Sequence, residues 1–200
     1  FTEEPRPLFH STALTFGPLF SHDGDVAVMG TTERSGAGDF SLIALDIVTG
    51  ERLGELYEEE ASFRPCRFSQ LPGDPRLLAS STQGGARRPL IWNPRTGERA
   101  DLPVGELDGD LTPVDWSADG HRILLLQIHQ AVQRLFMYEV EPQELRRLDH
   151  PPGTFGSVYF TSVGEVFAEL QDSSRPTRLV KLDEKTDTEG RTLLHGDETL

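Results

Sequence analysis

Cysteine and long apolar runs are scarce in this chain of 200 residues. A single cysteine, Cys66, forms neither an internal disulfide nor a zinc site. We expect it to be a small buried residue on a strand and not a nucleophile, because free cysteine is commonly buried. No apolar stretch approaches the roughly 20 residues that a membrane helix needs, so we expect no membrane span.

Positive charge is also in short supply. Lysine and arginine number 19 against 33 aspartates and glutamates, and the formal net charge is −14. A chain of this charge lacks the clustered cations that bind phosphate backbones, so we expect no nucleic-acid partner. The sequence begins at Phe1 with no charged-then-apolar leader, which leaves the compartment undefined and the cytoplasm favoured.

The familiar catalytic motifs are missing from the sequence. No serine stands in Gly-x-Ser-x-Gly, the strained turn that carries the nucleophile of α/β-hydrolases. No His-Glu-x-x-His occurs, and the glycines at 36 and 38 lack the lysine of a phosphate loop. We therefore predict no catalytic, cofactor-binding or metal-binding residue and no cofactor, and whether the chain belongs to an enzyme stays open.

One short pattern is present in four copies. An aromatic residue ends an extended run and is followed by serine or threonine and a turn with glycine. A period of roughly 40–50 residues built from short strands is the signature of a β-propeller. The anchors, 48, 48 and 44 residues apart, are Phe20, Phe68, Trp116 and Phe160.

Each copy predicts a blade of four antiparallel strands, and the anchors are expected to be core between blades. The fold class is therefore all-β, an arc of about four four-stranded blades. Asp or Asn and then Gly mark the turn between third and fourth strands. The first to fourth strands are expected at 14–20, 26–29, 41–45 and 51–56; at 63–68, 76–79, 89–92 and 98–102; at 111–116, 123–126, 135–138 and 144–148; and at 155–160, 165–168, 178–182 and 191–194.

The pattern Arg-x-Leu-x-His recurs at fourth-strand ends and sets the domain organisation. It ends at His10, His150 and His195, which we expect to be structural. Residues 1–10 are then expected to be the last strand of a preceding blade. The chain would therefore be an arc of a larger ring. Because propellers close at about 4–8 blades, we expect a ring of seven or eight. The predicted single propeller region 1–200 divides into blades 11–57, 58–104, 105–150 and 151–196 and a linker 197–200.

A few charged residues are weak candidates for contact with a substrate or a partner domain. Glu58, Glu59 and Glu60 could hold a substrate's ammonium group at a tunnel mouth, and Arg87 and Arg88 could meet carboxylates of a partner domain. A solvated linker and a solvated loop are the simpler interpretations. A site in the central tunnel would need converging arginines, histidines and carboxylates, and the first strands offer only Arg64, Arg67 and Asp115.

Three stretches carry a family resemblance. Residues 111–126, 145–153 and 172–179 resemble blades of the prolyl oligopeptidase family of serine peptidases, with the acylaminoacyl-peptidase and dipeptidyl-peptidase branches most similar. The resemblance implies a non-catalytic propeller that covers an α/β-hydrolase domain of the same polypeptide and admits short peptides. The triad would lie in that domain, and no catalytic residue can be assigned to this chain.

The alternative is a stand-alone propeller scaffold that binds protein partners, similar to bacterial envelope propellers and without enzymatic activity. Peptide specificity and oligomeric state, a homo-oligomer included, stay open.

Overall fold

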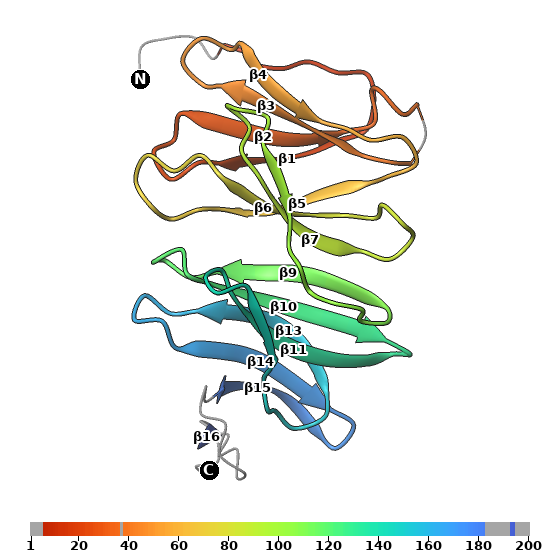
Figure 1. The fold of residues 1–200 in the computed structure, drawn as a ribbon, viewed down its shortest axis with the longest axis vertical. Helices are drawn as coiled ribbons and strands as arrows, with labels where there is room; N and C mark the ends of the chain where they lie inside the picture. Colours follow the sequence, from red (N-terminus) through yellow and green to blue (C-terminus); the bar gives the residue numbers. More distant parts are fainter. Residues whose placement is uncertain (1–5, 37, 183–192, 195–200) are drawn as a thin grey trace. The chain divides into compact units, whose positions relative to one another are not determined.

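Four antiparallel sheets of four strands make up the described part of the chain, residues 6–36, 38–182 and 193–194, in the computed structural model (Figure 1). Each sheet is made from four strands in sequence order. The first holds β1 (Thr15–Phe20), β2 (Val26–Thr31), β3 (Ser41–Asp46) and β4 (Arg52–Leu56); the second holds β5 (Phe63–Phe68), β6 (Leu77–Ser81), β7 (Arg88–Trp92) and β8 (Arg99–Asp101). The third holds β9 (Asp110–Trp116), β10 (Arg122–His129), β11 (Val132–Glu139) and β12 (Glu144–Arg147); the fourth holds β13 (Thr154–Phe160), β14 (Val166–Asp172), β15 (Arg175–Leu182) and β16 (Leu193–Leu194).

The predicted strands agree with these sheets. β5 has the predicted bounds, and the other described strands overlap their predicted ranges. Residues 6–10 lie in no strand, residues 1–5 and His195 lie outside the described part, and the division into blades stays a prediction. Among the described residues no helix is long and apolar enough to cross a membrane.

The chain divides into two compact units, one of residues 1–85 and 90–100 and the other of 86–89 and 101–200. In the first unit, one face of the first sheet packs on the second sheet. Alternate residues of β2 and β3, such as Val26 and Leu42, point to this face because side chains on a strand alternate between its two sides. They meet the fully buried Phe63 and Trp92 of the second sheet.

The second unit repeats this packing with the third and fourth sheets. Leu124, Leu135 and Met137 of the third sheet form one core with Phe155 and Ala168 of the fourth. Ile123, Leu124 and Leu125 are consecutive and all fully buried. A strand with apolar residues on both sides is covered on both sides, as the sequence predicted for this run.

The turns follow the predicted chemistry. Oδ1 of Asp46 accepts hydrogen bonds of 2.9 and 2.8 Å from the backbone amides of Val48 and Thr49, and Gly50 follows with φ +79°. Oδ1 of Asn93 accepts a bond of 3.0 Å from Arg95 in the next sheet. A side-chain acceptor followed by a left-handed glycine makes each of these hairpins compact.

The first strand of every sheet lies at an edge and has an irregular register. The register shifts between Phe16 and Leu19 in β1, between Pro65 and Arg67 in β5, and between Phe155 and Val158 in β13. In β9 it shifts between Pro113 and Asp115, which pair with Leu125 and Leu124. Three of these strands also contain a proline. Proline lacks an amide hydrogen and is tolerated in sheets at edges and bulges, which is where these prolines lie.

The anchor residues are not all core, and this corrects one expectation. Phe68 and Trp116 are buried, whereas the Phe20 side chain is 56% exposed. Phe68 packs in a core that includes Val26 of the preceding sheet, and the Arg122 guanidinium lies 5.1 Å from the ring centre of Phe160. Phe68 and Phe160 are thus in contact with the sheet before them, and no sheet precedes Phe20 among the described residues.

Candidate functional site

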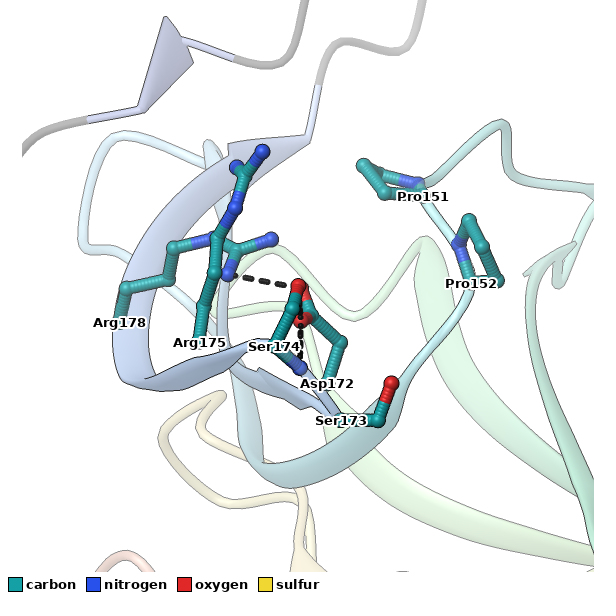
Figure 2. Close-up of a pocket in the computed structure, with 7 residues that line it drawn as sticks. All are labelled: Pro151, Pro152, Asp172, Ser173, Ser174, Arg175 and Arg178. Carbon is teal, nitrogen blue, oxygen red and sulfur yellow. Dashed lines mark hydrogen bonds and ion pairs between the residues drawn. The ribbon is translucent and has the colours of Figure 1, made fainter.

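The second unit contains a pocket of about 480 Å³ between a hairpin and a linker (Figure 2). Its lining residues are Pro151, Pro152, Asp172, Ser173, Ser174, Arg175 and Arg178. The prolines come from the connection between β12 and β13, and the other five come from the β14–β15 hairpin. A volume between about 300 and 1,000 Å³ is typical of sites that bind small molecules.

Asp172 organises the hairpin. Its Oδ1 accepts hydrogen bonds from the backbone amide of Ser174 at 2.9 Å and from the Ser174 hydroxyl at 2.7 Å. Its Oδ2 lies 3.0 Å from Nη1 of Arg178. These two hydrogen bonds from Ser174, with help from Arg178, lower the pKa of Asp172 to about 2, so the carboxylate is charged at neutral pH.

Two guanidinium groups face the same pocket. Figure 2 shows Arg175 and Arg178 on the hairpin side and the two prolines across from them. The Arg178 side chain is 16% exposed, whereas Arg175 is exposed. The arrangement presents hydrogen-bond donors and positive charge opposite an apolar wall, which is suited to binding an anion.

The acidic run at 58–60 was a predicted contact site. The structure places Glu58 in an ion pair, with Oε1 2.8 Å from Nη1 of Arg99, whose guanidinium also lies 5.5 Å from the ring centre of Phe63. Glu59 and Glu60 are exposed in the connection between β4 and β5. The three carboxylates therefore do not act as one cluster, and their contact with a substrate stays a prediction.

Arg87, at the end of the β6–β7 loop, and Arg88, the first residue of β7, differ in their surroundings. Arg88 donates to the carbonyl oxygens of Leu107 at 2.5 Å and Gly109 at 2.6 Å. The Arg87 backbone amide donates to Oδ1 of Asp110 at 2.8 Å. Arg88 thus fastens the connection that leads to β9, and a contact of either arginine with a partner domain stays a prediction.

The three residues of the first strands that were candidates for a tunnel site differ in their exposure. Arg64 and Arg67 are exposed on β5, and Asp115 is buried on β9. In the described part of the chain, no three histidine, cysteine, aspartate or glutamate residues gather as metal ligands would. Cys66 is half-buried and not fully buried as predicted, and it lies on β5 where the register with β6 shifts between Pro65 and Arg67.

Sequence reasoning missed the pocket residues Ser173, Arg175 and Arg178. They were noted only for their family resemblance. The signal available was a short polar turn, Asp-Ser-Ser-Arg, with a second arginine three residues later. That signal does not show that a proline pair 20 residues earlier closes the other side of the pocket.

Solved structures resemble the chain in fold. Puromycin hydrolase matches 97% of this chain and 31% of its own, with a TM-score of 0.70 and 16% identity. TolB from Acinetobacter baumannii matches 96% of this chain and 46% of its own, with a TM-score of 0.66 and 14% identity. A structure from a study of two prolyl endopeptidases matches 90% of this chain and 26% of its own, with a TM-score of 0.65 and 14% identity.

The chain has the fold of β-propeller blades. The predicted fold class is confirmed, as is the resemblance in fold to prolyl oligopeptidase-type propellers, while the number of blades in a ring stays a prediction. The chain spans less than half of the length of each of these three structures. No family model and no curated protein matches it.

Proposed function

We propose that this chain is part of the non-catalytic propeller of a serine peptidase of the prolyl oligopeptidase family. In this proposal the propeller covers an α/β-hydrolase domain of the same polypeptide and restricts its access to short peptides. The observation that carries it is the likeness to puromycin hydrolase, which extends over 97% of this chain but only 31% of that enzyme. The remaining length of that enzyme is room for a further domain, and this chain has no Gly-x-Ser-x-Gly of its own.

The proposed role follows from the chemistry that the hydrolase would perform. A serine attacks the peptide carbonyl, a histidine takes its proton, an aspartate orients the histidine, and backbone amides hold the oxyanion. A cover that excludes water and large substrates leaves these steps to the hydrolase and selects what reaches it. The study of prolyl endopeptidases attributes to those enzymes a role of inter-domain dynamics in catalysis and specificity.

A fluorophosphonate probe tests the proposal on the intact protein, because it labels an activated serine covalently. We expect labelling of the folded protein, none after heat denaturation, and cleavage of short peptides but not of a folded protein substrate. A folded intact protein that takes up no label and cleaves no peptide would contradict the peptidase function.

The second candidate is a propeller scaffold without a hydrolase that binds protein partners. The likeness to TolB supports this candidate, because the matched region extends over 96% of this chain at a TM-score of 0.66. Sequencing the parent reading frame past Leu200 separates the two candidates. Gly-x-Ser-x-Gly followed by aspartate and histidine favours the peptidase, and further blades without these motifs favour the scaffold.

A further inference from the structure

Hydrogen-bond donors outnumber acceptors in the pocket between the β14–β15 hairpin and Pro151–Pro152. Nε and Nη1 of Arg178 are enclosed and have no hydrogen-bond acceptor among the residues that the structure describes. Nη1 lies 3.0 Å from Oδ2 of Asp172, which makes an ion pair but not a hydrogen bond of good geometry. Buried donors in folded proteins are nearly always paired, so this guanidinium lacks acceptor atoms.

Asp172, the carboxylate among the described lining residues of the pocket, cannot satisfy the remaining donors. Oδ1 of Asp172 already accepts two hydrogen bonds from Ser174. Arg175 has no ion pair within the described ranges, and its side chain lines the same pocket. Among the described residues that line the pocket, two guanidinium groups stand against one carboxylate and give a local excess of positive charge, although the whole chain carries −14.

We propose that this pocket is a binding site for the anionic group of a small ligand, a carboxylate or a phosphate. The planar guanidinium fork matches the oxygen geometry of both groups and can bind either through two parallel hydrogen bonds. The Ser173 hydroxyl, which also lines the pocket, adds one more donor. Pro151 and Pro152 form an apolar wall that accommodates the uncharged body of the ligand. The proposal does not depend on a peptidase function.

Titration calorimetry on the intact protein tests the site with two probes, inorganic phosphate and N-acetylalanine. Arg175→Gln removes an exposed cation of the pocket, and Arg147→Gln removes an exposed cation of β12 in the same unit. We expect saturable binding of at least one probe, weakened about tenfold or more by Arg175→Gln, since charge-assisted hydrogen bonds are the strong ones. Arg147→Gln should leave the affinity unchanged.

A labelling experiment locates the site without any substitution. Phenylglyoxal modifies accessible arginines, and mass spectrometry reports the rate at each one. The bound probe should slow the modification of Arg175 and leave that of Arg147 unchanged. Arg178→Gln is a second variant, and because Arg178 pairs with Asp172, its folding is checked first by circular dichroism.

Three results would overturn the proposal. The first is that neither probe binds to the folded protein. The second is that a probe binds to the wild type and to Arg175→Gln with equal affinity. The third is that phenylglyoxal modifies Arg175 at the same rate with and without a bound probe. Binding of only one of the two probes supports the site and identifies its ligand class. None of these measurements uses catalytic activity, so their outcome is separate from that of the fluorophosphonate test.

Discussion

Oδ2 of Asp115 accepts a hydrogen bond of 2.7 Å from the backbone amide of Phe160, which lies 45 residues later in the chain. The bond joins the first strand of the third sheet to the first strand of the fourth. The Asp115 side chain is buried, with 2% of the residue exposed. Such a bond fixes two neighbouring blades at a point where their backbones do not pair.

Asp115→Ala should therefore destabilise the second unit. It leaves the Phe160 amide without this acceptor, and an unsatisfied buried donor costs about 1–3 kcal/mol. Urea unfolding, followed by fluorescence, measures the loss of free energy of unfolding. Asp115→Asn keeps an acceptor oxygen and serves as the matched variant, so an equal loss in both variants would argue against this hydrogen bond as the cause.

His150 makes stability depend on pH. Its Nε2 accepts a hydrogen bond of 3.2 Å from the Leu135 amide, and its ring packs edge-on against Phe155. Burial is the main cause that lowers the pKa of His150 below 6.5. The unfolded state then binds more protons than the folded state. The contribution of His150 to the free energy of unfolding is therefore complete above pH 6.5, and it is lost as the pH falls through the lower pKa that His150 has in the folded state.

His150→Gln should flatten that dependence. We expect the difference in free energy of unfolding between pH 7.5 and pH 5.5 to be smaller in this variant than in the wild type, because glutamine keeps an acceptor but does not titrate. His22→Gln, at an exposed turn position, is the control. An unchanged pH dependence in His150→Gln would assign the effect to other groups.

Gly54 permits a close approach between the first and second sheets. A Cβ at this position would lie 2.7 Å from the carbonyl oxygen of Pro94, which belongs to the backbone and cannot rotate away. Gly54→Ala should cost about 1–3 kcal/mol through overpacking. Gly38→Ala, where nothing lies within 4 Å of the new Cβ, should leave the urea midpoint nearly unchanged.

Arg88 should matter for the connection between the second and third sheets. Arg88→Gln shortens the side chain, so that the carbonyl oxygens of Leu107 and Gly109 lose a charged donor. Hydrogen exchange of the amides of residues 105–109 should become faster by about tenfold, since bonds to charged groups contribute about 1.5–3 kcal/mol. Arg147→Gln should leave this exchange unchanged, and protection of residues 105–109 in both variants would exclude the fastening role.

The strands could be predicted because their signals are local. The Ser-x-Asp-Gly turn and the anchor before it fix the first two strands of a blade, and Asp46 and Asn93 mark the third turn by bonds within a few residues. The length of β10 could not be read in this way. Its last residues, Gln127–His129, are in the strand because they pair with β11, and pairing is not visible in local hydrophobicity.

The candidate site was less predictable because its contacts span long sequence separations. The sequence does not show that Arg88 donates to carbonyl oxygens of the connection at 107–109, about 20 residues later. Phe20 has the same sequence pattern as Phe68, yet its burial depends on which sheet precedes it. Arg175 and Arg178 line a pocket because Pro151 and Pro152, from an earlier part of the chain, lie on its other side.

The irregular first strands have a consequence for how this propeller can recognise a polypeptide. Extended peptides often bind by adding a strand to an open sheet edge, which requires a regular row of amide and carbonyl groups. Pro18, Pro65 and Pro113 remove donors from three of these edges, and a bulge at 156–157 interrupts the fourth. We therefore expect that an extended peptide would not add to these edges as a regular extra strand.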